Sequence, residues 1–303
     1  MMRARHTAKW ALSILALAVL ALQAGCAASG SAAGTVSEPS PTPPPTRTPE
    51  DPTLAPSPTT GSTSTPGPIG TPTTSIVKFG PGRVEIPILL YHRVAAKGAP
   101  ARYTIAPQDF EQQIAFLQQA GYRSIRLSQL VEAIQKGAML PEHPIVLTFD
   151  DGNLDNYANA FPILQKYGMI GVAFVVADRL DSDGYLNAVQ VRAMAAAGWE
   201  IGSHSMTHTD LTTLSDERVR VEIHDSKVQL ESILGFPIES FAYPFGKADP
   251  GLVHKVFEYG YLSGAGLGIS LIHGPETLYY LDRREVWGTF DMKAFQKLLV
   301  QPR

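Results

Sequence analysis

The chain has 303 residues, of which 44% are apolar and 17% charged, and its 25 basic and 28 acidic side chains leave a formal net charge of −3. This length suffices for one large domain or two ordinary ones. The charge balance argues against a nucleic-acid partner, whose binding needs a clustered excess of Lys and Arg. A single cysteine excludes an internal disulfide framework and a thiolate metal cluster.

Residues 1–26 have the organisation of a bacterial export signal. Basic residues precede an apolar run at 10–22, and small residues follow it up to Cys26. The run is too short to span a bilayer, which takes about 20 residues. The segment ending at Cys26 resembles the lipobox of bacterial lipoproteins, with Leu22 one position early. The resemblance implies a lipid anchor on Cys26 that attaches the protein to the membrane. A cleaved signal without lipid and an uncleaved N-terminal anchor are the alternatives, and all three place the protein outside the cytoplasm, in the cell envelope.

Residues 27–75 are rich in Pro, Thr and Ser, with 12 Pro and 12 Thr between positions 35 and 75. Such a segment cannot bury enough apolar surface to offset the entropy lost on ordering. We therefore expect a disordered linker that tethers a single folded domain, residues 76–303.

Within residues 76–303, short apolar runs alternate with segments of helical periodicity. In chain order the sequence predicts a strand at 86–91, a helix at 107–120, a strand at 145–149, a helix at 161–167, a strand at 171–176, a helix at 189–197, a strand at 199–202, a helix at 216–234 and a strand at 240–243. Repeated β-then-α units of this kind predict an α/β fold whose parallel sheet closes, or nearly closes, into a barrel. An open doubly wound sheet is the alternative.

Three clusters of residues follow predicted strands, at the edge where α/β barrels place their active sites. The first is TFDDG, residues 148–152, in which Asp150 and Asp151 are adjacent. Two carboxylates at the end of a buried strand repel each other unless a positive group lies near them. On its own, this cluster is equally compatible with a solvated Asp-Gly turn.

The second cluster is HSMTH, residues 204–208. Histidines at positions i and i+4 would share one face of a helical turn and could bind one metal ion through their imidazoles. With one carboxylate of TFDDG, His204 and His208 would form a two-His, one-carboxylate site with open positions for water and substrate, which suits metal-assisted hydrolysis. An accidental surface pair is the alternative for HSMTH alone.

The third cluster is FAYPFG, residues 241–246, where Pro and Gly flank an aromatic residue and let the backbone approach a ligand; a simple β-to-α turn is the alternative. In this order and spacing, the three clusters resemble the polysaccharide deacetylases of carbohydrate esterase family 4. The resemblance covers residues 86–299 and implies a distorted (β/α) barrel of about seven strands. It also implies hydrolytic removal of N-acetyl groups from N-acetylglucosamine polymers, or of O-acetyl groups from xylan.

Carried over by position, the resemblance assigns roles to individual residues. Asp150 would be the general base that takes a proton from the attacking water, and the backbone N–H of Phe245 would stabilise the oxyanion, with Tyr243 beside it at the substrate. The ligands of a divalent metal would be Asp151, His204 and His208. Zn²⁺ is the expected ion, and Co²⁺ or Ni²⁺ suit the same ligands.

The proton donor departs from the usual arrangement. Most members of the family carry the acidic histidine near the C-terminal end, whereas here His273 precedes the LDRREV segment and His92 follows the first strand, in ILLYHRV. This order resembles the permuted poly-N-acetylglucosamine deacetylases of biofilm exopolysaccharide. It implies His92 as the general acid, with His273 as the alternative.

Two positions differ from the third motif of the family. Ala242 stands where an arginine usually pairs with the base, and Phe245 replaces a tyrosine. Arg283 is a candidate for the missing cation, with a surface ion pair as the alternative. Trp287 is a candidate for a wall of the acetyl pocket, with a core position as the alternative.

Taken together, these residues predict a metal-dependent N-deacetylase acting on a β-linked N-acetylglucosamine polymer, either an exopolysaccharide or peptidoglycan. A catalytically impaired glycan-binding module of the same fold is the alternative, and only Ala242 favours it. A metal-dependent phosphoesterase fits less well, because no cluster of Arg or Lys accompanies the motifs.

Overall fold

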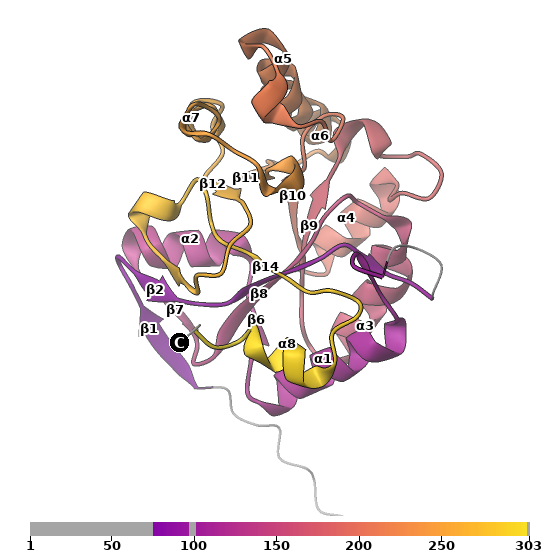
Figure 1. The fold of residues 1–303 in the computed structure, drawn as a ribbon, viewed down its shortest axis with the longest axis vertical. Coiled ribbons are helices and arrows are strands. Elements are labelled where there is room, and N and C mark those ends of the chain that lie inside the picture. Colours follow the sequence, from indigo (N-terminus) through magenta and orange to yellow (C-terminus); the bar gives the residue numbers. More distant parts are fainter. Residues whose placement is uncertain (1–74, 97–100, 302–303) are drawn as a thin grey trace, which may run out of the picture. The chain divides into compact units, whose positions relative to one another are not determined.

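The computed structural model describes residues 75–96 and 101–301 (Figure 1). The predicted signal, with Cys26, and the predicted linker up to residue 74 lie outside the described residues. None of the helices in the described ranges has the length and apolar composition that crossing a membrane requires.

A curled sheet of seven parallel strands lies at the centre of the domain, which confirms the predicted barrel-type α/β fold. An additional strand, β6 (Arg123–Ser124), pairs with β8 beside the seven. In order across the sheet, the seven strands are β12 (Ser263–Ala265), β11 (Ser240–Ala242), β10 (Glu200–Ser203), β9 (Val172–Val175), β8 (Pro144–Phe149), β3 (Ile88–Tyr91) and β14 (Arg284–Glu285). Short pairs outside the main sheet are formed by β1 (Ile76–Phe79) with β7 (Ala138–Pro141), β2 (Val84–Glu85) with β13 (Ile272–His273), and β4 (Arg93–Val94) with β5 (Thr104–Ile105).

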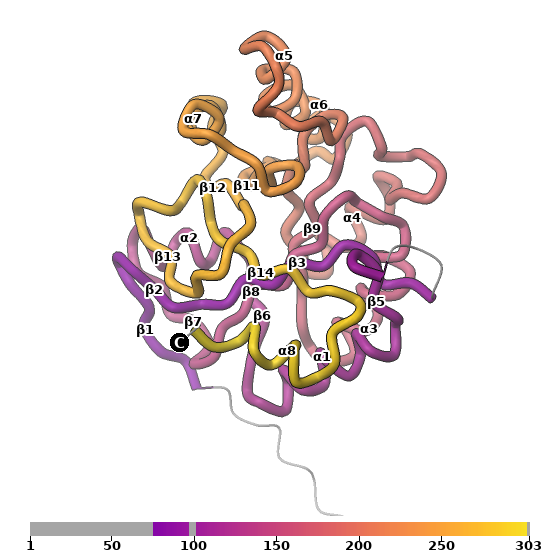
Figure 2. Tube along the Cα trace, viewed as in Figure 1, coloured from indigo at the N-terminus to yellow at the C-terminus, as the bar shows by residue number. Residues whose placement is uncertain are grey.

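Helices surround the sheet (Figures 1 and 2). They are α1 (Pro107–Gln119), α2 (Leu127–Lys136), α3 (Phe161–Lys166), α4 (Ala188–Ala196), α5 (Asp216–Arg220), α6 (Ser226–Leu234), α7 (Pro250–Glu258) and α8 (Met292–Lys297). The helix predicted at 216–234 is present, but a π-helical turn, η4 (Val221–Asp225), separates α5 from α6. A second π-helical turn, η1 (Asn156–Ala160), precedes α3.

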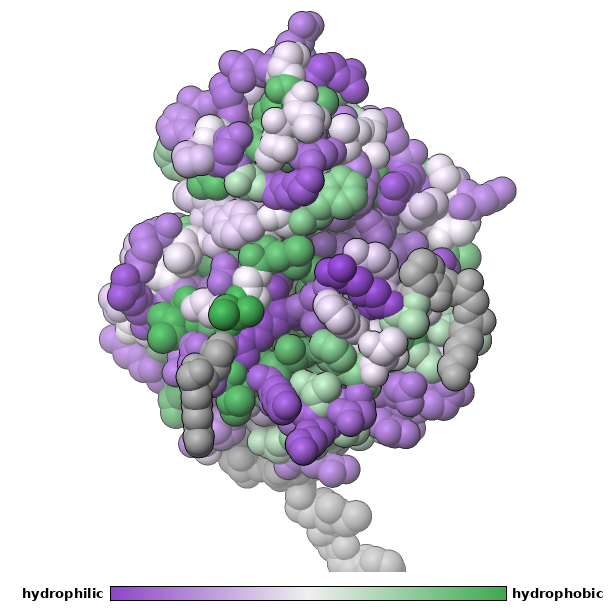
Figure 3. Space-filling view, viewed as in Figure 1, coloured by the Kyte–Doolittle hydropathy of each residue, from purple (hydrophilic) through white to green (hydrophobic). Residues whose placement is uncertain are grey.

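The burial of strands and helices explains the apolar patterns in the sequence. All six residues of β8 are buried, because helices cover one face of the sheet and the barrel interior covers the other, so this strand is a continuous apolar run rather than an alternating one. In α1 the apolar side chains Phe110, Ile114 and Leu117 recur at helical spacing and are fully buried. On the outside, hydrophilic and hydrophobic residues are interspersed across the face in view (Figure 3).

The two edges of the sheet are joined through the segment that precedes β14. The Gly264 N–H donates to Leu278 O at 3.0 Å, and the Leu281 N–H donates to Gly264 O at 2.8 Å. Glycine is required at 264 by this close approach, because a methyl group there would lie 2.5 Å from Tyr279 O. The closure brings Arg283, which follows at once, into the interior of the barrel.

We expect Gly264→Ala to destabilise the domain, because the added methyl group would collide with the backbone of the closing segment. Overpacking of this kind costs roughly 1–3 kcal/mol. The matched control is Gly251→Ala in α7, whose added methyl group would meet only the side chain of Asp249, at 3.1 Å. Urea unfolding measures both variants, and equal midpoints would contradict the described closure.

Candidate active site

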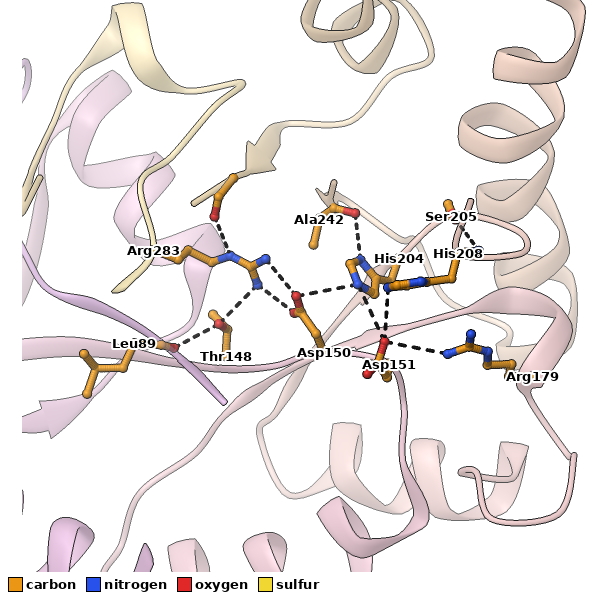
Figure 4. A network of polar contacts seen from close by, with 11 residues as sticks. Leu89, Thr148, Asp150, Asp151, Arg179, His204, Ser205, His208, Ala242 and Arg283 are labelled. Carbon is orange, nitrogen blue, oxygen red and sulfur yellow. Dashed lines mark hydrogen bonds and ion pairs between the residues drawn. The ribbon is translucent and has the colours of Figure 1, made fainter. Parts of the chain in front are cut away.

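Asp150 and Asp151 leave the end of β8 in different directions (Figure 4). Asp151 adopts a left-handed backbone conformation, with φ of 73°, which is uncommon for a residue other than glycine. Strained conformations of this kind tend to occur where function fixes the geometry. As a result, Asp150 points toward Arg283, whereas Asp151 points toward the two histidines and Arg179.

Asp150 and Arg283 form a buried bidentate ion pair. Arg283 donates from Nη1 to Oδ1 at 2.7 Å and from Nη2 to Oδ2 at 2.8 Å, and its side chain is 1% exposed. Its Nε donates to Gly266 O at 3.0 Å, and Thr148 Oγ1 accepts a further bond at 3.3 Å. Burial alone would raise the pKa of Asp150, but the Arg283 guanidinium, together with the neighbouring His204 and His92, outweighs burial and holds that pKa at about 2.

The His204 and His208 side chains converge on Asp151. His208 Nε2 lies 3.3 Å from Asp151 Oδ1, and His204 Nε2 lies 3.9 Å from the same oxygen. His204 Nδ1 is 2.8 Å from Ala242 O, a contact in which this nitrogen carries the proton and leaves Nε2 as a free acceptor. One donor atom from each of the three residues lies within 4.8 Å of the others.

This donor set fits a divalent cation. Two imidazole nitrogens and one carboxylate are the ligands of many hydrolytic metal sites that keep a position open for water. Burial is the main cause, and the neighbouring His204 the second, that lowers the pKa of His208 to about 4. Its imidazole is therefore neutral at pH 7, as a metal ligand requires.

The predicted helical turn at residues 204–208 is wrong. These residues form a loop after β10, in which Ser205 and His208 have φ of 67° and 65°. In a helical turn, spacing alone would bring the two imidazoles onto one face. Here the loop path brings them together, and the Ser205 hydroxyl accepts a bond from the His208 N–H at 2.9 Å.

His92 lines the same cleft and lies directly after β3. Its ring packs against Tyr103, with centroids 4.7 Å apart, and burial lowers its pKa. Asn156 in η1 holds the backbone there, because its Nδ2 donates to His92 O at 2.9 Å. The neighbouring Asp155 accepts the Val94 N–H at 2.9 Å.

His273, the alternative proton donor, lies elsewhere. It is buried in β13, where its Nε2 is 3.1 Å from Ile86 O, and it does not line the cleft.

The cleft has a volume of about 360 Å³. Phe245 lines it with φ of 59° and a ring 4.7 Å from that of His208. Tyr243 does not line it, because its side chain is fully buried and its hydroxyl donates to Tyr279 O at 2.7 Å. Trp287 lies in an adjoining hollow, where it stacks on Phe290 and its Nε1 donates to Glu285. Of the predicted residues, those that line the cleft are His92, Asp150, Asp151, His204, His208, Phe245 and Arg283.

Two residues that border the site were not predicted from the sequence. Arg179 Nη1 lies 3.7 Å from Asp151 Oδ1, and Tyr103 covers one face of His92. Neither belongs to a recognisable motif. Asp155 and Asn156 were also missed, although their position directly after TFDDG, in the polar run NLDN, was an available signal.

A family model described as polysaccharide deacetylase matches residues 138–263. The chain is similar to members of this family over that range. The protein YxkH of Bacillus subtilis (strain 168), named as a polysaccharide deacetylase, is 26% identical over 211 residues, which cover 70% of this chain and 75% of YxkH. The structure of Streptococcus pyogenes deacetylase PplD in complex with acetate superposes with a TM-score of 0.67 and 25% identity, covering 72% of this chain and 99% of PplD. A Staphylococcus aureus (strain MSSA476) poly-β-1,6-N-acetyl-D-glucosamine N-deacetylase is 22% identical over 197 residues, which cover 60% of this chain and 67% of that protein.

This similarity to polysaccharide deacetylases indicates a deacetylase hydrolase. A guanidinium lies beside Asp150 although the third motif has Ala242 in place of an arginine. Arg283, which directly precedes β14, pairs with Asp150. Ala242 contributes its carbonyl oxygen, which contacts His204 Nδ1. The single observation that favoured an impaired binding module was the missing arginine at 242. Because Arg283 occupies the partner position of Asp150, that observation no longer supports the alternative.

The pKa of Asp150 predicts a specific pH dependence of stability. A carboxyl group whose pKa is lowered by folding, here to about 2 from an ordinary value near 4, stabilises the fold fully above that ordinary value and loses its contribution as the pH falls through about 2. We expect the difference in unfolding free energy between wild type and Asp150→Asn to shrink by about 2 kcal/mol between pH 5 and pH 2.

Denaturant unfolding at several pH values, in the presence of a chelator, measures this difference. Asp183→Asn, which removes an exposed carboxylate, is the control for loss of charge. A difference between wild type and Asp150→Asn that stays constant over this range would contradict the assignment.

Proposed function

We propose that the protein is a metal-dependent N-deacetylase of a β-linked N-acetylglucosamine polymer, either an exopolysaccharide such as poly-N-acetylglucosamine or peptidoglycan. The observation that carries the proposal is the convergence of three candidate metal ligands, an ionised carboxylate and a third histidine, His92, on one cleft. The similarity to the Staphylococcus aureus poly-β-1,6-N-acetyl-D-glucosamine N-deacetylase supports the poly-N-acetylglucosamine assignment.

A divalent cation held by Asp151, His204 and His208 would polarise the acetyl carbonyl and make water acidic enough to attack at neutral pH. Asp150 would accept the proton of the attacking water. Its Oδ2 lies 3.6 Å from His204 Nε2, so the carboxylate borders the position that such a cation takes, and Arg283 keeps it ionised and fixed in orientation.

Two groups that line the cleft would then complete the hydrolysis. As the water oxygen bonds to the carbonyl carbon, negative charge develops on the carbonyl oxygen, and the backbone N–H of Phe245 is the candidate donor to it. The carbon–nitrogen bond breaks when the amine receives a proton from His92. Burial lowers the pKa of His92, which makes its imidazolium a stronger acid. The products are acetate and the free amine.

We expect Asp150→Asn to reduce acetate release by a factor of 10² or more while metal binding persists, because Asp150 is a base and not a ligand. His204→Ala should lose both activity and metal, since it removes a ligand. Acetate release from N-acetylglucosamine oligomers and metal content after dialysis measure the two effects. Full activity of either variant, or wild-type protein that binds these oligomers without releasing acetate, would contradict the proposal.

The proton-donor assignment has a separate test. We expect His92→Ala to lower kcat by roughly 10²-fold or more, because His92 lines the cleft and would protonate the leaving amine. His273→Ala should leave kcat near the wild-type value in protein that remains folded, since His273 bonds to Ile86 O away from the cleft. The reverse pattern in steady-state kinetics would exclude His92 as the acid.

A further inference from the structure

The loop that carries His204 and His208 has no regular structure to fix it. It contains two left-handed residues, Ser205 and His208, and three residues separate the two histidines along the chain. Contacts with other parts of the fold must therefore hold its path. The first half is held by β9 and the segment after it, since the His204 N–H donates to Val175 O at 2.8 Å and Ser205 O accepts the Ala177 N–H at 3.1 Å.

The second half of the loop is held by Glu222 in the π-helical turn η4. Glu222 Oε2 accepts the Thr207 N–H at 2.9 Å, and Oε1 accepts the Thr207 hydroxyl at 2.7 Å. The backbone oxygen of Glu222 accepts the Met206 N–H at 3.0 Å. Three bonds from one residue thus fix the two residues that precede His208.

The Glu222 side chain is buried, and the loop satisfies its carboxylate. Its side chain is 0% exposed, and the nearby cation, Arg218 Nη2, lies 3.8 Å from Oε1 on a side chain that is 58% exposed. A carboxylate so deeply buried is expensive unless donors satisfy it, and here both of its oxygens accept bonds from Thr207. The π-helical turn places Glu222 on the loop side, and such turns occur frequently at functional sites.

We propose that Glu222 is a positioning residue of the metal centre: through Met206 and Thr207 it sets where the His208 imidazole lies relative to His204 and Asp151. The inference rests on the proposed metal-dependent function. Residues that orient metal ligands without touching the metal typically change metal affinity 10–100-fold when they are replaced.

The test is Zn²⁺ affinity, measured by competition with a chromophoric chelator on the full-length, metal-stripped protein at a temperature where each variant is folded. Glu222→Ala should raise the Kd for Zn²⁺ by about tenfold or more, because it removes both side-chain bonds to Thr207. Thr207→Val, which removes the hydroxyl and its contacts with Glu222 and Thr209 but keeps the N–H bond to Glu222 Oε2, should raise it by a smaller factor. This second variant also serves if Glu222→Ala does not fold.

Glu222→Gln should keep the Kd within about threefold of wild type. Its amide oxygen would accept the Thr207 N–H and its amide nitrogen would donate to Thr207 Oγ1, whose proton then turns to Thr209 Oγ1, 2.8 Å away. The matched control is Glu231→Ala in α6, because Glu231 also accepts a backbone N–H, that of Ile238 at 2.9 Å, but does not contact the loop.

An unchanged Kd in Glu222→Ala or Thr207→Val, or an equal rise in Glu231→Ala, would overturn the positioning role while leaving the proposed function intact. A Gln variant as weak as the Ala variant would also overturn it, since charge rather than hydrogen bonding would then matter. Wild-type protein that binds no Zn²⁺, Co²⁺ or Ni²⁺ would instead remove the metal-dependent function on which the inference rests.

Discussion

The buried ion pair between Asp150 and Arg283 is the contact on which the rest of the site depends. Taking two charges out of water is costly, and the cost is offset only when the geometry is good and the remaining polar atoms are satisfied. Both conditions hold, because the pair is bidentate and the third guanidinium nitrogen donates to Gly266 O. Loss of either partner would leave an uncompensated charge in the barrel interior.

The same pair resolves the repulsion between two adjacent carboxylates. Asp150 is directed to Arg283 and Asp151 to the histidines, so each carboxylate has a different positive or polar environment. For Asp150 the bidentate contact with Arg283 fixes the orientation of the carboxylate, but it also lowers the basicity of that carboxylate. The lowered pKa makes Asp150 a weak base toward a resting water. In the proposed hydrolysis, proton transfer to Asp150 would therefore accompany attack, when bonding to the carbonyl carbon makes the proton more acidic.

The sequence predicted the parts of the fold that depend on local pattern. The apolar run of β8 and the helical spacing of Phe110, Ile114 and Leu117 each reflect burial of a short segment, which periodicity records. The motifs at 148–152 and 204–208 follow neighbouring parts of one parallel sheet, so their side chains were expected at the same edge. The proximity of these side chains could therefore be predicted without knowing any long-range contact.

Other features depend on distant contacts or on the direction of one side chain. The partner of Asp150 is 133 residues away and reaches it only because glycines allow β12 and the segment before β14 to approach. The left-handed conformations of Ser205 and His208 carry no glycine signal, so a helical turn was predicted in their place. The direction of the Tyr243 side chain, into the core instead of the cleft, is set by its bond to Tyr279 O.

The fold constrains where the site residues lie around the cleft more than it constrains their order along the chain. The family model matches residues 138–263, which contain Asp150, Asp151 and both histidines of the candidate metal site, whereas His92 and Arg283 lie outside it on either side. In the sheet, however, β3 pairs with β8 and β14 pairs with β3, so His92 follows the strand next to β8 and Arg283 precedes the strand beyond it. Because parallel strands present their carboxyl ends at one edge, a histidine that follows β3 reaches the cleft as readily as one near the C-terminal end. The fold therefore permits a permuted chain order without a change in the geometry of the cleft.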